Sequence, residues 1–469
     1  MIIQVLAVLL WGVVAVLAVY TARHYTFTFN RLFGRQRQPY VDITVADWPA
    51  VTVFIPCHNE EQVIRGSLDA LLAADYPHDR LTIIPIDDRS TDSTGQILRE
   101  YAERHPDLVR PVWRTGGMPG KAAALAEASA RVGSEVHLVF DADYIPGPKL
   151  LKQLVAPFFD PEVGAVMGRV VPQNVSSSLL TRLLDLERAG GYQVDQQARM
   201  NMGLVPQYGG TVGGVRREAL SSVGGWRTDT LAEDTDMTFR LLLAGWEVVY
   251  QNRSECYEEV PENWPTRIRQ IRRWTHGHNQ ALKRYVARVL ARKGNVTWTQ
   301  ALDGTLLLGV FAVGPILLLG WVLAFTLYYL GYQPSSGILM LLIVSAFSTL
   351  GNFAAFFEVA AATRLDGSRH RVRLLPFLFF GFLVSLLAVS QETILQFVGR
   401  GLGRRAKRWD KTERYRQVQP GNGSVDAGKA GGGNGGNGGN GGNGGNGGNG
   451  GNGHGGGRAG DGSIEGGRG

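Results

Sequence analysis

Long apolar segments constrain this chain more than any other sequence feature, because they separate a membrane part from a water-exposed part. A helix needs about 20 predominantly apolar residues to cross a bilayer. Four segments approach or exceed that length: residues 2–20, 306–330, 337–363 and 374–398. The first has no preceding basic region and no clean small-residue cleavage site, so we expect a retained anchor over residues 1–22 rather than a signal peptide. The other three predict C-terminal transmembrane segments over residues 304–399.

Positive charge beside these segments predicts their orientation. Several arginines lie between residues 23 and 37, directly after the first segment. Arginine-rich flanks favour the cytoplasmic side of a membrane. We therefore expect residues 47–298 to be cytoplasmic and the protein to be a multi-pass protein of the plasma membrane. The basic stretch at residues 364–373 fits the same side.

The basic segment at residues 400–420 raises a difficulty, because three full crossings after residue 298 would place it outside the cell. Gln391 and Glu392 interrupt the last apolar segment, and a carboxylate inside a bilayer is costly. If residues 390–398 lie along the interface, that crossing is incomplete and the basic segment stays in the cytoplasm, as we predict. Residues 421–469 repeat Asn-Gly-Gly with almost no apolar side chains, and we expect them to be disordered.

Charge and cysteine content limit the possible partners. The net charge of +7 is compatible with nucleic acid, anionic lipid or phosphorylated substrates. The apolar segments favour membrane lipid, and we expect no nucleic-acid partner because the basic run lies next to these segments. Cys57 and Cys256 are the only cysteines, which excludes a disulfide framework and a zinc cluster.

The region between the first and second apolar segments has an α/β pattern. Strands are predicted at residues 51–55, 81–86 and 136–140, and helices at residues 61–74, 94–104 and 122–131. This alternation is typical of parallel βαβ units. Ligands bind beyond the carboxyl ends of strands in such sheets. Three polar clusters should therefore meet at one edge: Pro56–Glu60, Asp87–Arg89 and Asp141–Asp143.

Two aspartate pairs at this edge predict a nucleotide and metal site. Asp141 and Asp143 follow a buried strand, where paired carboxylates can share a hard divalent cation that also binds substrate phosphates. An isolated Asp-x-Asp is more often a strand-end turn, but Asp87 and Asp88 at a neighbouring strand end favour the site. Asp87 and Asp88 suit hydrogen bonds to the base and ribose of a nucleotide. Glu60 belongs to the same edge as a candidate substrate contact.

Lys121 is a candidate phosphate ligand. It follows the glycine-containing loop Gly116–Gly120 and precedes an alanine-rich helical run. A lysine near a helix N-terminus can bind phosphate there, and a solvated lysine is the equally weighted alternative. The pattern Gly-x4-Gly-Lys-Ser/Thr is missing, which excludes an ATPase P-loop.

Three carboxylates fall at Glu233, Asp234 and Asp236, before an amphipathic run. Acidic residues are common at a helix N-terminus, so capping is the simple alternative, and we predict it for Asp236. A general base must reach an acceptor hydroxyl, and crowded carboxylates raise one another's proton affinity. We therefore predict Asp234 as the base, with Glu233 in support.

Residues 267–293 are rich in arginine and lysine and contain no acidic residue. Apolar residues approximate one face of a helix, which predicts a basic amphipathic helix at the membrane surface. Some of its cations could neutralise a diphosphate. A solvated cationic face is the alternative and fits the distal half better. We assign no role to His276 or His278.

Taken in order, these motifs resemble the membrane-integrated family 2 glycosyltransferases, such as cellulose, hyaluronan, chitin and poly-N-acetylglucosamine synthases. The resemblance covers residue 51 through the last apolar segment. It rests on Asp87-Asp88, Asp141-x-Asp143, Glu233-Asp234 and Gln270-x-x-Arg273-Trp274. Two positions differ from the usual family pattern: Ala232 where threonine is usual, and Ile271 where glutamine or arginine is usual.

This resemblance implies a fold, a reaction and several residue roles. The fold would be a GT-A, Rossmann-like glycosyltransferase domain with transmembrane helices. The reaction would be inverting transfer from a nucleotide-diphosphate sugar, usually a UDP-sugar, with Mg²⁺ or Mn²⁺ at Asp141 and Asp143. Asp88 would contact the nucleotide, Gln270 and Arg273 the diphosphate, and Trp274 the acceptor sugar. The loop Gly209-Gly210-Thr211 would line the acceptor site.

The expected function is synthesis of a polysaccharide at the membrane, coupled to export, with accessory export subunits as possible partners. A rival enzyme would use the same donor site to add one sugar to a membrane lipid. A third alternative is a catalytically inactive sugar-nucleotide-binding component of an export complex. The intact Asp141, Asp143 and Asp234 argue against this last alternative.

Overall fold

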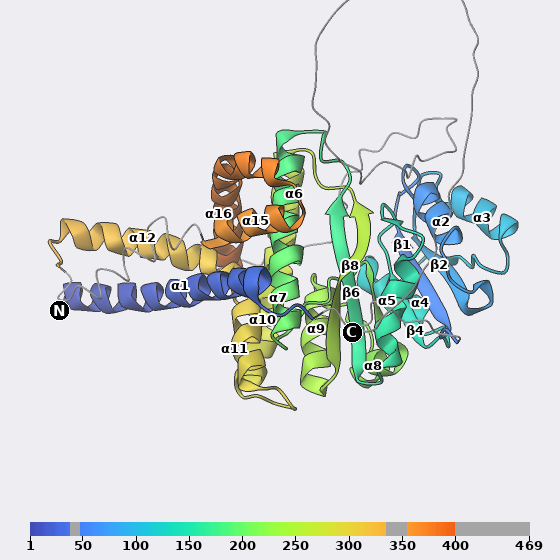
Figure 1. Cartoon of the computed structure of the whole chain (residues 1–469), viewed down its shortest axis with the longest axis horizontal. Coiled ribbons are helices and arrows are strands. Elements are labelled where there is room, and N and C mark those ends of the chain that lie inside the picture. Colours follow the sequence, from blue (N-terminus) through green and yellow to red (C-terminus); the bar gives the residue numbers. More distant parts are fainter. Residues whose placement is uncertain (38–46, 334–353, 399–469) are drawn as a thin grey trace, which may run out of the picture. The chain divides into compact units, whose positions relative to one another are not determined.

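The structure is a computed structural model that describes residues 1–37, 47–333 and 354–398 (Figure 1). Within these residues, eight strands form one sheet in the order β3-β2-β1-β4-β7-β6-β8-β5. The strand bounds are β1 Val51–Cys57, β2 Leu81–Asp88, β3 Val112–Arg114, β4 Val136–Val139, β5 Ile145–Pro146, β6 Val163–Pro172, β7 Gly213–Arg216 and β8 Glu247–Glu258.

Helices precede the sheet, connect its strands and follow it. Those up to the end of the sheet are α1 Ile2–Phe33, α2 Ile64–Leu72, α3 Thr94–Arg104, α4 Lys121–Ser129, α5 Leu150–Val155, α6 Leu179–Ala189, α7 Gln197–Asn201, α8 Arg217–Ser222 and α9 Glu233–Ala244. Those after it are α10 Trp264–Leu290, α11 Trp298–Leu308, α12 Val313–Tyr329, α15 Ala354–Leu365 and α16 Leu375–Val398. Short helical turns are η1 His78–Arg80, η2 Ala156–Phe159, η3 Gly190–Gln196, η4 Val310–Ala312 and η5 Arg369–Leu374.

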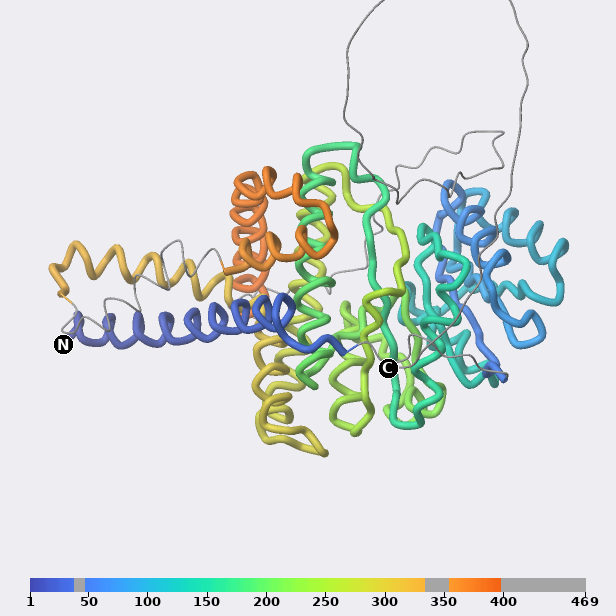
Figure 2. Tube along the Cα trace, viewed as in Figure 1, coloured from blue at the N-terminus to red at the C-terminus, as the bar shows by residue number. Residues whose placement is uncertain are grey.

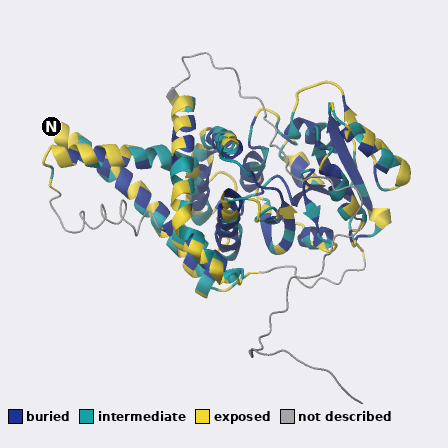
Figure 3. Ribbon diagram, turned by 90° about the horizontal axis from the view of Figure 1, so that it is seen from above, coloured by how far each residue is buried: buried dark blue, intermediate teal, exposed yellow. Residues whose placement is uncertain are grey.

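The sheet is covered on both faces, which explains why its strands are apolar runs. Successive side chains of a strand point to opposite faces. In β1, Val53 and Ile55 pack in a cluster with residues of α2 and α3, whereas Phe54 packs in a second cluster with residues of α4 and α9. Strands buried on both sides show continuous hydrophobic stretches. Figure 3 shows these buried strands in dark blue between helices with exposed outer faces.

The predicted α/β class is confirmed, but the sheet is mixed rather than wholly parallel. Strands β2, β1 and β4 are parallel neighbours, and β3 is parallel to β2. Strand β7 is antiparallel to both β4 and β6, and β5 is antiparallel to β8. The helix predicted at residues 94–104 is confirmed as α3. Strand β2 continues two residues beyond its predicted end, so Asp87 and Asp88 belong to the strand and not to the following loop.

Three helices are long and apolar enough to cross a membrane, among the residues that the structure describes. They span Ile2–Phe33, Val310–Tyr329 and Arg369–Phe397, and they match three of the four apolar segments in the sequence. Helix α1 runs well past the predicted end at residue 22. Most of the remaining apolar segment, residues 337–363, lies outside the described residues, as do residues 400–420 and 421–469.

Helices α1 and α12 pack against each other in opposite directions. The Trp11 indole N–H lies 3.4 Å from the Tyr332 hydroxyl, just beyond the end of α12. At the other end, the Tyr20 hydroxyl donates to the Leu306 carbonyl at 2.7 Å, before α12 begins. Apolar side chains of both helices form one cluster, which Leu386 of α16 joins. Figure 2 shows the two chain segments running side by side.

Helix α16 packs lengthwise against α10. The contacts follow one another along both helices in the same direction, with nearly constant spacing. They are Trp264 with Phe380, Ile271 with Ala388 and Val389, His276 with Glu392, Asn279 with Thr393, and Lys283 with Phe397. The polar residues that interrupt the last apolar segment therefore pair with polar residues of α10.

Candidate active site

The carboxyl ends of β1, β2 and β4 meet at one edge of the sheet, as the sequence predicted. Cys57 at the end of β1 is paired with Asp87 of β2, and Phe54 is paired with Val139 at the end of β4. Asp141 and Asp143 follow β4 by two and four residues. The three polar clusters therefore share this edge, which we call the strand-end rim.

Strand β7 brings the glycine loop to the same rim. Because β7 is antiparallel to β4, its first residue Gly213 lies beside Val139, the last residue of β4. The preceding Thr211 therefore reaches Asp141, and the Asp141 backbone N–H donates to Thr211 Oγ1 at 3.2 Å. Gly210 has φ +70° and packs against Asp234, where an added Cβ would lie 3.0 Å from the Asp234 Cβ. The loop thus links the β4 carboxylates to the start of α9.

Lys121 lies at the centre of the predicted carboxylates. Its ammonium nitrogen is 2.6 Å from Asp141 Oδ1. Burial opposes the charged form of Lys121, but the charges of Asp141, Glu233 and Asp234 outweigh burial and raise the pKa of its ammonium. Residues from α4, the β4 end and the start of α9 therefore form one electrostatic cluster.

Glu233 is a carboxylate of this cluster with a raised pKa. Burial and the neighbouring charge of Asp234 raise its pKa, while Lys121 and Arg273 act in the opposite direction. Arg273 comes from α10, so this helix also reaches the cluster. Perturbed carboxylates in contact with cations are typical of functional sites, although structural ion pairs can produce the same pattern.

Asp87 and Asp88 engage the protein itself. Asp88 Oδ2 accepts the Gly120 N–H at 2.9 Å, and Asp88 Oδ1 lies 2.8 Å from Arg114 Nη1. Asp87 Oδ1 accepts the Ser90 N–H at 3.0 Å. Asp88 therefore fixes the loop that carries Lys121. Nucleotide contact by this pair stays a prediction.

Glu60 and Gln270 occupy different surroundings. Glu60 is buried on the rim, and its backbone N–H donates to Thr94 Oγ1 at 2.8 Å. Gln270 Oε1 accepts from Arg267 Nη1 at 2.8 Å, within α10. Substrate contact by these two residues also stays a prediction.

Trp274 is linked to the aspartate pair through residues that the sequence analysis did not single out. The guanidinium groups of Arg188 and Arg267 lie 5.4 Å and 5.2 Å from its ring centroid. Arg188 Nε donates to Glu258 Oε1 at 2.7 Å, and Glu258 Oε2 accepts the Tyr144 hydroxyl at 2.7 Å. Tyr144 directly follows Asp143, and burial with the charge of Glu258 raises its pKa. Glu258 is the last residue of β8. A carboxylate at a strand end is the sequence signal that could have identified it as a site residue.

The capping role predicted for Asp236 is wrong. Its carboxylate is buried and accepts from Arg240 Nε at 2.7 Å, Arg284 Nη1 at 3.0 Å and the Tyr285 hydroxyl at 2.6 Å. Arg284 and Tyr285 belong to α10. Asp236 therefore joins α9 to α10, a tertiary role that local sequence cannot reveal. On the basic face of α10, Arg284 is therefore paired with a carboxylate, so this face is not merely solvated.

The aspartate pair fits a divalent cation in its chemistry. Asp141 retains 32% side-chain exposure, whereas Asp143 is 2% exposed and its Oδ2 accepts the Glu259 N–H at 3.3 Å. The Lys121 ammonium already occupies a cation position beside Asp141. No group of three His, Cys, Asp or Glu side chains suited to a metal exists within the described part of the chain. A cation at this pair would therefore depend on substrate phosphates and water for its other ligands, as is usual for Mg²⁺.

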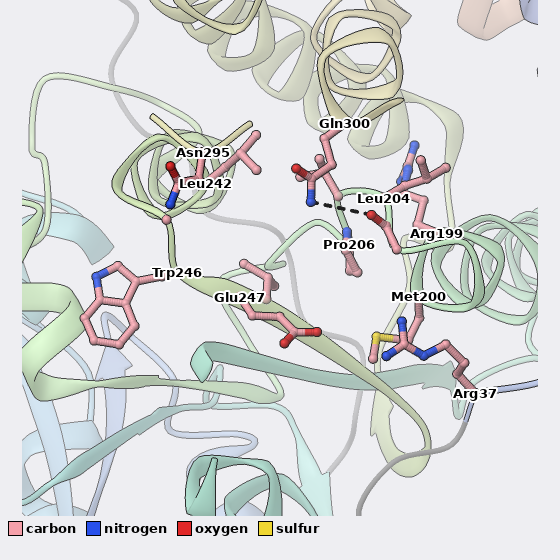
Figure 4. A pocket seen from close by; sticks show the side chains of 14 residues that line it. Arg37, Arg199, Met200, Leu204, Pro206, Leu242, Trp246, Glu247, Asn295 and Gln300 are labelled. Carbon is pink, nitrogen blue, oxygen red and sulfur yellow. Dashed lines mark hydrogen bonds between the residues drawn. The ribbon is translucent and has the colours of Figure 1, made fainter. Parts of the chain in front are cut away.

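A separate cavity of about 220 Å³ lies elsewhere in the molecule. Its lining includes Arg199, the loop Gly203–Pro206, the turn at Gly245 and Gln300 (Figure 4). The Gln300 amide reaches across to the Gly203 carbonyl at 3.5 Å. None of the predicted site residues lines this cavity, so we do not assign the donor to it.

One protein family matches the part of the chain that contains the sheet. The family described as glycosyltransferase like family 2 matches residues 49–277. The probable glycosyltransferase YdaM of Bacillus subtilis (strain 168) is 28% identical over 406 residues, which is 85% of this chain and 93% of that protein.

Two further relatives match about half of this chain. The β-monoglucosyldiacylglycerol synthase of Synechocystis sp. (strain ATCC 27184 / PCC 6803 / Kazusa) is 33% identical and covers 51% of this chain and 50% of its own length. The probable glucomannan 4-β-mannosyltransferase 6 of Oryza sativa subsp. japonica is 31% identical and covers 54% of this chain and 45% of its own length.

A solved structure shares the fold. The mannosyltransferase PcManGT of Pyrobaculum calidifontis, in complex with GDP-Man and Mn²⁺, is 24% identical and has a TM-score of 0.54. The match covers 78% of this chain and 98% of that structure. The predicted GT-A-like fold is thereby confirmed. The family match and the nearly full-length relative together place residues 49–277 in glycosyltransferase family 2.

Proposed function

We propose that this protein transfers a sugar, with inversion, from a nucleotide-diphosphate donor to a growing polysaccharide at the membrane. The observation that carries the proposal is the cluster of Asp141, Lys121, Glu233 and Asp234. Three separate elements supply them: Lys121 begins α4, Asp141 follows β4, and Glu233 and Asp234 begin α9. Their convergence supports one site that can hold a diphosphate and deprotonate an acceptor.

In the proposed reaction, Asp234 accepts the proton of the acceptor hydroxyl while that oxygen attacks the anomeric carbon of the donor. The bond between this carbon and the diphosphate oxygen breaks, and the nucleoside diphosphate leaves with the bonding electrons. One displacement inverts the anomeric centre. Lys121 and Arg273 lie close enough to the carboxylates to contribute positive charge near the diphosphate.

Asp141 and Asp143 would hold Mg²⁺ or Mn²⁺, which would neutralise charge on the departing diphosphate. The Mn²⁺ in the mannosyltransferase of similar fold supports this choice. We further propose that Glu60, Asp87 and Asp88 contact the nucleotide side of the donor. Gln270 would contact the diphosphate, and Gly210, Thr211 and Trp274 would line the acceptor site.

A second candidate function is the addition of a single sugar to a membrane lipid. It is favoured by the β-monoglucosyldiacylglycerol synthase among the relatives. Both functions use the same donor chemistry and differ in the acceptor. The glucomannan mannosyltransferase among the relatives supports a polysaccharide product instead.

The proposed function is tested by incubating membranes that contain the protein with UDP-glucose, UDP-N-acetylglucosamine and GDP-mannose. We expect nucleotide release from one donor class, dependent on Mg²⁺ or Mn²⁺ and reduced about 100-fold or more by EDTA, because a bound cation typically supplies several kcal/mol. Labelled products of many sugars support polysaccharide synthesis, and a single labelled glycolipid supports the second candidate. Release from none of these donors would contradict both.

We also propose that α1 and α12 cross the membrane, whereas α16 lies along the interface on the cytoplasmic side. Near the start of α16, the Arg371 guanidinium lies 2.7 Å from the Asp185 carboxylate of α6. Near its end, Glu392 pairs with His276 of α10 at 3.0 Å. Both ends of α16 therefore contact the catalytic region, which a crossing helix could not do. An amphipathic partner such as α10 is typical of the interface.

This arrangement predicts the side of the C-terminal tail. A reporter that works only in the cytoplasm should be active when it is fused after Arg416. An alkaline phosphatase fused at the same place should be inactive. A matched fusion after Tyr332, beyond the far end of α12, should give the reverse result. Active alkaline phosphatase after Arg416 would show that α16 crosses the membrane.

A further inference from the structure

His278 is a residue of α10 whose imidazole faces the first turn of α9. Its Nε2 atom lies 3.1 Å from Thr235 Oγ1. Its Nδ1 atom is buried and has no hydrogen-bond partner within the described residues. The ring makes an edge contact with Phe311, at a centroid distance of 4.8 Å. Because Thr235 directly follows Asp234, this histidine is one residue removed from the proposed base.

The Thr235 hydroxyl has three polar neighbours and only one hydrogen to donate. Gln207 Nε2 lies 2.9 Å away, and an amide nitrogen can only donate. Asp234 Oδ1 lies 3.3 Å away, and a carboxylate can only accept. His278 Nε2 is the third neighbour, and its protonation decides which group receives the hydroxyl hydrogen.

The surroundings of His278 determine that protonation. Burial lowers the pKa of His278 to about 4, although the charge of Asp234 acts in the opposite direction. The ring is therefore neutral near pH 7 and carries one N–H. A hydrogen on Nδ1 would be a buried donor without an acceptor, which costs free energy. A hydrogen on Nε2 instead donates to Thr235 Oγ1.

With this tautomer, each of the three contacts of the hydroxyl pairs one donor with one acceptor. Thr235 Oγ1 accepts from Gln207 and His278 and donates its own hydrogen to Asp234 Oδ1. The Thr235 backbone N–H donates to the same oxygen at 2.6 Å. Asp234 Oδ1 is thus held by two donors. The other oxygen, Oδ2, lies toward Gly210, where an added Cβ would be 3.7 Å from it.

We propose that His278 is a positioning residue that acts through Thr235 to orient the Asp234 carboxylate, so that Oδ2 is presented to the acceptor. This inference rests on the proposed role of Asp234 as base. It assigns a task to a side chain of α10 that is independent of substrate contact. It also explains why a neutral, buried histidine faces a catalytic helix.

The test compares four single variants and one double variant, each with the donor that gives the fastest nucleotide release among UDP-glucose, UDP-N-acetylglucosamine and GDP-mannose. His278→Leu and Thr235→Val should each lower kcat about tenfold or more, because a misaligned base loses rate steeply, while the donor KM changes less than about twofold. His278→Gln and Thr235→Ser keep a donor and a hydroxyl and should recover most of kcat. The double variant His278→Leu/Thr235→Val should lose no more than either alone.

His276→Gln is the matched control, because His276 lies on the same helix but pairs with Glu392 of α16. It should retain kcat. If His278→Leu proves unstable, Thr235→Val decides the outcome, since it removes a hydroxyl with little change in shape. Normal kcat in Thr235→Val, or equal loss in His278→Gln and His278→Leu, would overturn the inference.

Failure of the inference is distinguishable from failure of the proposed function. An inactive Asp234→Asn variant beside fully active His278→Leu and Thr235→Val variants would remove the positioning role and leave the base in place. An active Asp234→Asn variant would remove the base, and the positioning role with it.

Discussion

Replacing Asp234 by asparagine should lower kcat about 10³-fold or more while leaving donor affinity nearly unchanged. Asparagine keeps the shape of the side chain and can still accept the Thr235 N–H that now reaches Asp234 Oδ1 at 2.6 Å. It cannot accept the proton of the acceptor hydroxyl, and general base catalysis typically contributes 10²- to 10⁴-fold. Turnover is measured as nucleotide release, and donor affinity as equilibrium binding of the intact nucleotide-diphosphate sugar.

Asp229→Asn is the matched control for this variant. Asp229 lies five residues before Asp234, and its carboxylate pairs with Arg284 at 2.9 Å on a half-exposed surface. The same chemical change there should leave kcat within about twofold, because exposed ion pairs contribute little. Turnover of Asp234→Asn close to that of the unmodified protein would exclude Asp234 as the base.

The strand-end rim could be predicted from sequence because its elements follow local periodicity. Parallel strands place their carboxyl ends at one edge, so the positions of Asp88 and Asp141 followed from the strand assignments alone. The place of β7 did not. It is four residues long and antiparallel to both neighbours, and no local pattern distinguishes that arrangement from a loop. Its insertion beside β4 brings Thr211 to Asp141.

The parts of the site that sequence reasoning missed depend on long-range pairing. Asp236 has the sequence surroundings of a helix-terminal acid, yet its partners Arg284 and Tyr285 lie about fifty residues away on α10. Glu258 likewise gains its role from Arg188 and Tyr144. A buried carboxylate requires such partners, but the sequence does not say which cations supply them. The same holds for Glu392, which is accommodated by His276 rather than by lipid.

Replacing Gly277 by alanine should disrupt the catalytic region as a unit. Gly277 lies in α10, and an added Cβ would be 2.6 Å from the Ala232 Cβ and 2.7 Å from the Ala232 backbone nitrogen. Ala232 directly precedes Glu233, so α10 and the start of α9 are in direct contact here. This contact also accounts for a small side chain at residue 232. Alanine at residue 277 would force the helix that carries Arg273 away from the turn that carries Asp234.

We expect Gly277→Ala to lower kcat about 100-fold, because displacements near 1 Å in a reacting site can have that effect, and to lower the free energy of unfolding by about 1–3 kcal/mol through overpacking. Gly381→Ala is the control, since its Cβ would meet only Trp264 at 3.7 Å. Adding Ala232→Gly to Gly277→Ala should restore activity only in part, because it removes the contact with the Ala232 methyl group but leaves the backbone nitrogen of residue 232 at 2.7 Å and the Leu231 backbone carbon at 2.9 Å. Full activity of Gly277→Ala alone would show that α9 and α10 can separate without moving Asp234. In that case the close approach of the two helices is not what aligns the site.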